Sequence, residues 1–173
     1  MKQIVITQAG GPDVLKIKEF PDMPLESNSV SITVKAIGIN FADILARQGL
    51  YPDAPKLPCV VGYEVAGEVT ALGESVDNKW LGQKVMALTR FNGYSDNVVV
   101  PIDQVFVIPD DLSFAEAAAI PANYLTAYQL IMVMGMLKED ESILIHNAGG
   151  GVGLAAIDLA KHIGAKIYGT ASS

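Results

Sequence analysis

A glycine-rich loop between an apolar run and a helical run constrains this chain more than any other feature. The loop consists of Ala148, Gly149, Gly150, Gly151, Val152 and Gly153. It follows the short apolar segment 142–146 and precedes residues 154–163, whose apolar positions recur with helical spacing. Residues 166–170 have the pattern of another strand. Together they predict a βαβ unit of about 30 residues with parallel strands. We expect its first strand to be buried on both faces.

Glycines in such a turn let an anion approach the main chain, because a Cβ atom would block it. The following helix adds unpaired N–H groups and a partial positive charge, which suit the pyrophosphate of a dinucleotide. A strand, a glycine loop, a helix and a second strand form the context that a dinucleotide site requires. The spacing departs from strict G-x-G-x-x-G and fits best at Gly150 and Gly153, behind Asn147. We predict that residues 148–153 bind a cofactor; the alternative is a flexible turn whose glycines serve packing.

The end of the second strand bears on which dinucleotide would bind. Enzymes that use NAD usually carry an acidic residue about 20 residues after the loop, where it holds the ribose 2′-hydroxyl. Residues 166–173 contain no acid, and Thr170, Ser172 and Ser173 supply hydroxyls instead. A 2′-phosphate would meet no carboxylate there, so the sequence predicts NADPH rather than NADH. The alternative is that the acid, or a basic partner, follows residue 173.

The residues before this unit have a different pattern. Short alternating runs punctuated by glycine and proline predict strands at 14–18, 30–35, 64–71, 84–88, 97–100 and 105–108, with a short helix at 41–47. Many short strands predict a mostly-β body that is partly rolled into a barrel. Ser113 and Glu116 then have capping-box spacing, Pro121 should break the helix they begin, and a further helical run covers 123–134.

Composition excludes several classes of protein. The chain has 12 Lys and Arg against 19 Asp and Glu, a net charge of −7, which argues against a nucleic-acid surface. Its one cysteine, Cys59, excludes an internal disulfide framework and a Cys-rich zinc cluster. The most apolar window, 125–137, is shorter than the about 20 residues of a membrane span, and no targeting segment is visible. We predict a cytoplasmic protein without a membrane span.

The fold class expected from these patterns is α/β. Two parallel strands and one helix cannot cover both faces of a parallel sheet. The chain is therefore predicted to be part of a longer protein, in which a mostly-β domain, residues 1–112, precedes the beginning of a doubly wound nucleotide-binding domain, residues 113–173.

Several motifs resemble the medium-chain dehydrogenase/reductase superfamily. They are NFADILARQGLYP at 40–52, PCVVGYEVAGEV at 58–69, GQKV at 82–85, NGYS at 92–95, NYLTAY at 123–128 and the glycine loop. The chain most resembles the zinc-free quinone oxidoreductase (zeta-crystallin-like) branch, near the vesicle amine transport protein relatives. The resemblance implies a GroES-like catalytic domain followed by the N-terminal part of a Rossmann NADPH-binding domain. It also implies a full-length chain about twice as long, because a complete nucleotide-binding domain requires that length. The full-length protein is expected to be a homodimer.

The resemblance also bears on metal binding. Zinc-dependent relatives carry Cys where this chain has Asn40, and His where it has Tyr63. A catalytic zinc site needs three suitable protein ligands and an open position. Cys59, His146 and His162 are scattered along the sequence and are expected to be structural. We predict no metal.

Without a metal, hydrogen bonds must polarise the substrate carbonyl, and a hydride from NADPH suits quinones and conjugated enones. The resemblance implies catalytic roles for Asn40 and Tyr51, and nicotinamide contacts for Asn40 and Thr126. Tyr63 and Leu45 are predicted to line the substrate pocket. Leu45 stands where many quinone reductases have Tyr, which makes the pocket more apolar there.

Each assignment has a structural alternative. Asn40 could cap the helix that begins at residue 41, and Tyr51 could be a turn aromatic. Tyr63 could satisfy its hydroxyl locally. Asp43 is expected to make a structural hydrogen bond. Two functions follow: an NADPH-dependent, zinc-independent reductase of small-molecule quinones or enones, or a non-enzymatic nucleotide-binding protein that is structural or vesicle-associated. Asn40 and Tyr63 disfavour a third, a zinc alcohol dehydrogenase.

Overall fold

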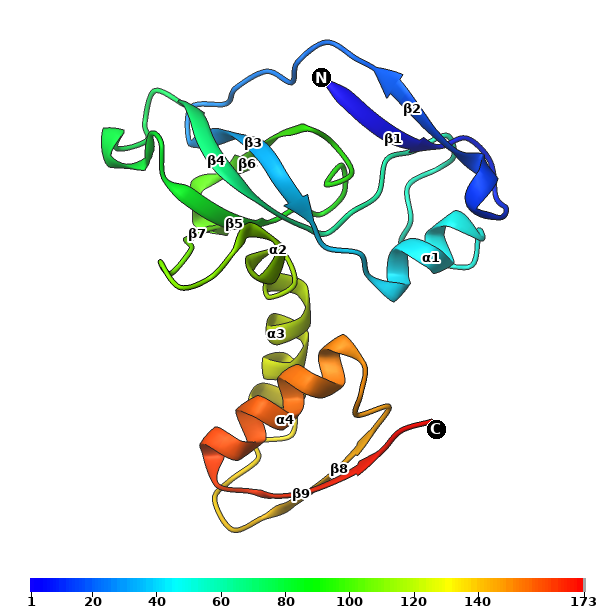
Figure 1. Ribbon diagram of the computed structural model, residues 1–173, viewed down its shortest axis with the longest axis vertical. Helices are drawn as coiled ribbons and strands as arrows, with labels where there is room; N and C mark the ends of the chain where they lie inside the picture. The colour runs from blue at the N-terminus through cyan, green and yellow to red at the C-terminus, as the bar shows by residue number, and fades with distance from the viewer. Residues whose placement is uncertain (173) are drawn as a thin grey trace. The chain divides into compact units, whose positions relative to one another are not determined.

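The computed structural model describes residues 1–172 (Figure 1). The chain divides into two compact units, Met1–Ala119 and a second that begins at Ile120. This division lies later than the sequence-based domain boundary between 112 and 113. The difference arises because helix α2 (Phe114–Ala117) packs on strands of the first unit. The buried side chains of that contact are Ala66, Ile108, Ala117 and Ala118.

The first unit is built on a five-stranded antiparallel sheet in the order β6-β3-β4-β5-β7. The sheet curves into a half barrel, as Figure 1 shows, which confirms the predicted mostly-β body. The strands are β3 (Ser29–Ile37), β4 (Glu64–Leu72), β5 (Lys84–Leu88), β6 (Asn97–Pro101) and β7 (Val105–Val107). Each overlaps a predicted run, because alternating apolar positions mark the one face that packs inward.

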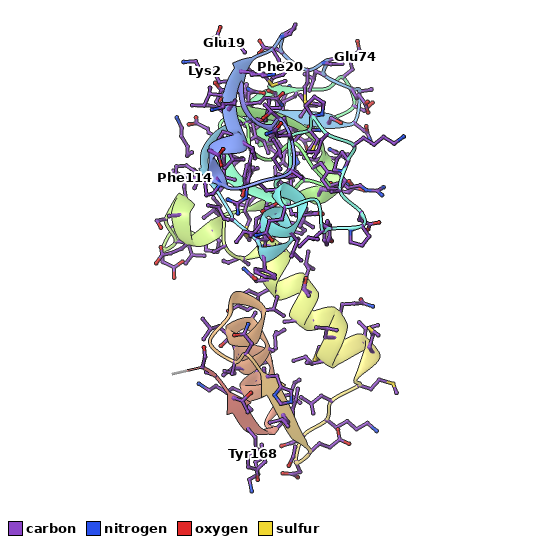
Figure 2. All side chains as sticks on the ribbon, turned by 90° about the vertical axis from the view of Figure 1, so that its right-hand side faces the viewer. Lys2, Glu19, Phe20, Glu74, Phe114 and Tyr168 are labelled. Atoms are coloured by element: carbon purple, nitrogen blue, oxygen red, sulfur yellow. The ribbon has the colours of Figure 1, made fainter. Side chains whose placement is uncertain are left out.

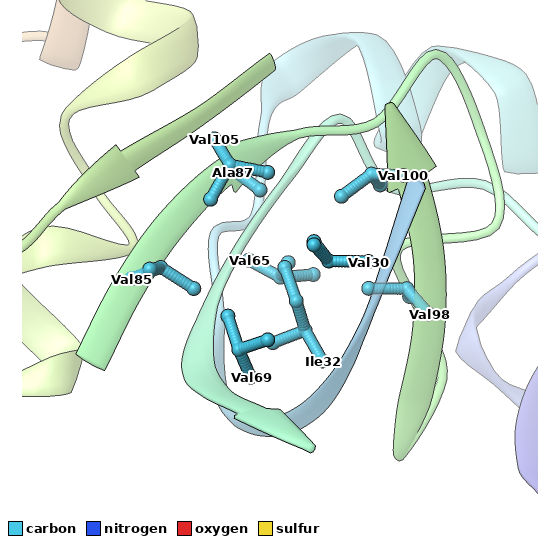
Figure 3. Close-up of a cluster of buried hydrophobic side chains, with 9 residues drawn as sticks. All are labelled: Val30, Ile32, Val65, Val69, Val85, Ala87, Val98, Val100 and Val105. Carbon is cyan, nitrogen blue, oxygen red and sulfur yellow. The ribbon is translucent and has the colours of Figure 1, made fainter. Parts of the chain in front are cut away.

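Aliphatic side chains, all but one of them β-branched, fill the inner face of this sheet (Figure 3). The buried set is Val30, Ile32, Val65, Val69, Val85, Ala87, Val98, Val100 and Val105. Full burial of one such side chain contributes about 1.5–3 kcal/mol. The β-branched residues also favour the extended backbone, so packing and local preference agree.

A hairpin and a short helix complete the first unit. Strands β1 (Lys2–Ile6) and β2 (Leu15–Glu19) pair antiparallel, and helix α1 covers Phe41–Arg47, as predicted. Strand β2 begins one residue after the predicted run 14–18, and β1 was not predicted. A second apolar cluster lies between these elements, and it includes the free thiol of Cys59, which is buried.

The helical segment after β7 is broken where the sequence predicted. Ser113 and Glu116 form the capping box: the Ser113 N–H donates to Glu116 Oε2 at 2.9 Å, and the Glu116 N–H donates to Ser113 Oγ at 3.3 Å. Helix α3 (Pro121–Tyr128) begins with Pro121 at its first turn, where the missing N–H costs nothing. Residues Gln129–Met134, expected to continue as an ordinary helix, form wider π-helical turns.

The second unit contains the predicted βαβ arrangement. Strands β8 (Ser142–His146) and β9 (Lys166–Thr170) are parallel, and helix α4 (Gly151–Ile163) lies on one face of the pair (Figure 1). Ile143 and Ile145 of β8 pack toward helices α3 and α4.

The prediction that β8 is buried on both faces is wrong for the described residues. Leu144 is 57% exposed, and Tyr168 of β9 projects outward (Figure 2). Within residues 1–172, helices cover only the face that carries Ile143 and Ile145, so the alternate side chains stay accessible.

One helical stretch, Phe114–Met134, is long and apolar enough to cross a membrane by length and composition alone. That is a weak indication, because the core helix of a globular protein passes the same test. The stretch is also interrupted, since α2 ends at Ala117 and α3 begins at Pro121. Residues 1–172 therefore contain no clear membrane span.

Candidate functional site

The glycine loop joins β8 to α4. Helix α4 begins at Gly151, and Gly150 is its N-cap residue, with φ −77° and ψ 165°. The helix thus starts before residue 154, where the apolar spacing begins. The sequence missed this first turn because Gly151, Val152 and Gly153 include two glycines, which carry no helical preference.

The outer part of the loop is open. A Cβ atom added at Gly149 would have no neighbour within 4 Å. A Cβ at Gly150 would lie 2.8 Å from the side-chain amide nitrogen of Asn147. Asn147 itself has a positive φ of 54°, which Asn tolerates better than most residues. The loop surface at Gly149 is therefore not filled by side chains.

The inner part of the loop is close-packed. A Cβ at Gly153 would collide with the carbonyl oxygen of Asn147 and the main chain of Ala148. A Cβ at Gly151 would collide with the side chain of Asn123 from α3. These glycines allow the first turn of α4 to fit against the loop and the neighbouring helix.

The N-terminus of α4 has no side-chain cap. Gly151, Val152 and Gly153 occupy its first three positions, where N–H groups lack a carbonyl partner within the helix. The next N–H, of Leu154, donates to the Gly150 carbonyl at 2.8 Å. An accessible loop ahead of uncapped N–H groups fits the phosphates of a dinucleotide, both sterically and through the helix dipole.

The ends of β8 and β9 are tied together beside this loop. The Ala148 N–H donates to the Thr170 carbonyl at 2.9 Å, and His146 Nδ1 lies 2.9 Å from Thr170 Oγ1. Thr170 and Ser172 are exposed, and residues 166–172 carry no acidic side chain. Ser173, also predicted to contact the cofactor, lies outside the described residues.

Helix α3 places two polar side chains near each other on its surface. Asn123 lies against Gly151, and Thr126, predicted to contact nicotinamide, is exposed three residues later. Sequence reasoning gave Asn123 no role, because only the fold brings it to the loop. The Tyr124 hydroxyl donates to Asp158 Oδ2 at 3.0 Å and joins α3 to α4.

In the first unit, Asn40 is held by two carboxylates. It is the N-cap residue of α1, and its N–H donates to Asp43 Oδ2 at 2.9 Å. Its side-chain nitrogen Nδ2 donates to Oε1 of Glu64, at the start of β4, at 2.9 Å. The helix-capping role foreseen as an alternative is present: Asn40 and Asp43 form a capping box, in which the Asn40 side chain faces the Asp43 N–H. The side-chain nitrogen of Asn40 makes its own contact with Glu64. Glu64 was not among the predicted site residues.

Asp43 has the structural role that the sequence favoured. The carboxylate is buried and accepts hydrogen bonds from the N–H groups of Asn40 and Gly62 and from the Tyr94 hydroxyl. Burial raises the pKa of Asp43, although these three hydrogen bonds oppose the shift. Burial, and then the charge of Asp43, raise the pKa of Tyr94.

Two of the predicted site residues lie together in an aromatic group. The rings of Tyr51 and Tyr63 meet edge to face with centroids 6.3 Å apart, and Phe91 lies 5.4 Å from Tyr63 on a tilted plane. Burial raises the pKa of Tyr63, and hydrogen bonding to Tyr51 adds to the shift. Leu45 is half-buried on α1 and has no aromatic ring to contribute to this group.

The described part of the chain, residues 1–172, contains no group of three or more His, Cys, Asp or Glu side chains that could hold a metal ion. Asn40 and Tyr63, which were predicted to stand in place of zinc ligands, have other partners. Asn40 donates to Glu64, and the ring of Tyr63 packs edge to face against Tyr51.

Comparisons with known proteins place this geometry in a family. Residues 26–129 match the model of the alcohol dehydrogenase GroES-like domain. The chain is 41% identical over 174 residues to the synaptic vesicle membrane protein VAT-1 homolog of Danio rerio, and the match covers 99% of this chain and 36% of that protein.

Two solved structures have the same fold over this length. The NADPH complex of Escherichia coli quinone oxidoreductase has a TM-score of 0.90 and 38% identity, with 100% of this chain and 53% of that chain covered. The CurK enoyl reductase has a TM-score of 0.93 and 33% identity, with 99% and 54% covered. The chain thus spans about half the length of these structures. It belongs to the medium-chain dehydrogenase/reductase family with a GroES-like domain, in the zinc-free, quinone oxidoreductase-like branch near the VAT-1 proteins.

Proposed function

We propose that the protein is an NADPH-dependent reductase that reduces quinones or α,β-unsaturated carbonyls without a metal. The observation that carries the proposal is the uncapped N-terminus of α4 behind the open loop at Gly149. The E. coli relative crystallised with NADPH is a quinone oxidoreductase and CurK is an enoyl reductase, which supports both substrate classes.

For the cofactor, we assign residues 148–153 to the pyrophosphate through their main-chain N–H groups. Thr170, Ser172 and Ser173 would lie beside the adenosine ribose, where the absence of an acid from 166–172 favours a 2′-phosphate. Thr126 would contact the nicotinamide amide. When bound, NADPH supplies the hydride that reduces the substrate.

For the substrate, we assign hydrogen bonding of the carbonyl oxygen to Asn40 and Tyr51. Tyr63 and Leu45 would line the pocket, one with a phenol and the other with an apolar surface. The raised pKa of Tyr63 keeps its hydroxyl protonated, so it can serve as a hydrogen-bond donor beside Tyr51.

The test measures cofactor binding and turnover separately in the full-length protein. Dissociation constants are determined for NADPH and NADH, and the loss of NADPH absorbance is followed with 1,4-quinones and enones. We expect tighter binding of NADPH, loss of that binding in Gly150→Leu, and an unchanged β-sheet signal by circular dichroism. Tighter binding of NADH, or retained affinity in Gly150→Leu, contradicts the cofactor assignment.

A second function has its own support. The VAT-1 homolog carries a vesicle-membrane name, which favours a non-enzymatic, vesicle-associated role with a bound nucleotide. Binding of NADPH without turnover of any quinone or enone would select this function.

We further propose that the protein is cytoplasmic, binds no nucleic acid, and forms a homodimer at full length. The net charge of −7 supports the absence of nucleic-acid binding, because such a surface would repel phosphates. Light scattering on the full-length protein tests the dimer, and fractionation of cells tests the location.

A further inference from the structure

Glu64 is a buried carboxylate that the proposed function does not use. It is 1% exposed at the first position of β4. Burial of a carboxylate carries a large desolvation cost unless hydrogen bonds offset it. One such bond comes from Asn40, whose Nδ2 lies 2.9 Å from Glu64 Oε1.

The surroundings hold Glu64 in one place. A Cβ at Gly38 would collide with Glu64 Cγ and Oε1 and with the carbonyl oxygen of Ala118. The Gly38 N–H also donates to the Glu64 carbonyl at 3.1 Å. Position 38 therefore accommodates the Glu64 side chain because it has no side chain of its own.

The main chain of Asn40 is fixed from the opposite side. Asp43 accepts the Asn40 N–H at 2.9 Å, and the Asp43 N–H donates to the Asn40 carbonyl at 3.0 Å. Asp43 is itself held by Gly62 and Tyr94. The capping box also turns the Asn40 side-chain oxygen toward the Asp43 N–H, so Glu64 acts on the other end of the amide, its nitrogen.

A carboxylate only accepts hydrogen bonds, whereas an amide has a donating and an accepting end. The Asn40 amide therefore turns its nitrogen toward Glu64 and its oxygen toward the Asp43 N–H, and its second N–H stays available to a ligand. We infer that Glu64 is a positioning residue that sets the amide orientation of Asn40. This inference rests on the proposed function in one respect: the ligand that meets the Asn40 amide is taken to be the substrate or cofactor of the reductase.

The test compares Glu64→Gln with Glu68→Gln. Both changes convert a carboxylate of β4 into an amide, but Glu68 is exposed. In Glu64→Gln the new side chain can present either end of its amide, so the Asn40 nitrogen loses a partner that only accepts hydrogen bonds. We expect kcat to fall about tenfold in Glu64→Gln, the value of one lost hydrogen bond, with little change in the substrate KM. Glu68→Gln should behave as wild type.

A double-mutant cycle separates positioning from general structural damage. If Glu64 acts through Asn40, Glu64→Gln should change kcat less than about twofold in an Asn40→Ala background. An undiminished effect in that background overturns the inference.

A measurement on the protein without cofactor distinguishes failure of this inference from failure of the proposed function. Nuclear magnetic resonance should show one Asn40 side-chain proton protected from exchange relative to those of exposed Asn78, and the Asn40 signal should shift in Glu64→Gln. Exchange as fast as that of Asn78 in the wild type overturns the inference, whether or not the variant folds. A protected proton without turnover would leave the inference standing and remove the reductase proposal.

Discussion

The carbonyl oxygen of Asn147 occupies the space in which a Cβ atom at Gly153 would have to lie. The loop therefore closes directly onto the first turn of α4. This contact, between residues six positions apart in the numbering, sets how near the uncapped N–H groups come to the open surface at Gly149.

Gly153→Ala should displace the loop. The added methyl group meets main-chain atoms of Asn147 and Ala148, which cannot rotate away, so we expect a loss of about 1–3 kcal/mol in the free energy of unfolding. NADPH affinity should fall with it. Gly149→Ala is the matched control for stability, because its Cβ enters open space, and it should keep the free energy of unfolding near the wild-type value. Equal losses of stability in the two variants would contradict the close packing at Gly153.

Asp43 should make stability depend on pH in acid solution. Burial raises its pKa above the ordinary value of 3.8. The folded state therefore favours the protonated form, and this contribution is present at low pH and lost as the pH rises through the raised value. Urea unfolding of wild type and Asp43→Asn, from pH about 4 to about 7, should show the free energy of unfolding of the wild type falling relative to that of the variant as the pH rises. A wild type that gains stability relative to the variant over this range would contradict the raised pKa.

Tyr63 should not ionise near pH about 10, where an ordinary tyrosine does. Burial, the hydrogen bond with Tyr51 and the nearby carboxylates of Asp43 and Asp53 all raise its pKa. Ultraviolet titration of Tyr63→Phe should therefore overlay that of wild type through this range. A missing phenolate step in the variant would show that Tyr63 titrates normally.

Removing a methylene group should cost more stability at a buried isoleucine of the sheet core than at an exposed one. Ile32 is fully buried on β3, whereas Ile17 is 73% exposed on β2. Ile32→Val should lower the free energy of unfolding by about 0.5–1.5 kcal/mol. Ile17→Val should change it by less than about 0.5 kcal/mol, as for most surface changes. Denaturant titration of both variants tests the assignment of the inner face.

Periodic elements were predictable from the sequence. The runs that became α1, β5 and β8 were predicted with the observed bounds, because the spacing of apolar residues and the flanking glycines and prolines mark both ends. The start of α4 was missed, since its first turn consists of two glycines and a valine and its anchoring comes from Asn147 and Asn123.

Contacts between distant residues were not predictable. Asn40 bonds to Glu64, 24 residues away, and Asp43 to Tyr94, 51 residues away. Neither pair has a local spacing rule, because strand pairing in the half barrel brings them together. The exposure of Leu144 was also missed, since an apolar strand signal does not say how many faces are covered.

Cys59 gives the protein a practical property. It is the only cysteine in residues 1–173, and it pairs with Ile6 of β1. Its thiol is buried in the apolar cluster that includes Val5 and Ile6, and this burial raises its pKa. Maleimide dyes and spin labels react with accessible thiolates, so Cys59 should stay unmodified in the folded protein. In the Gly149→Cys variant the new thiol would carry a reporter on the open surface of the loop, and Cys59 would not compete for the label.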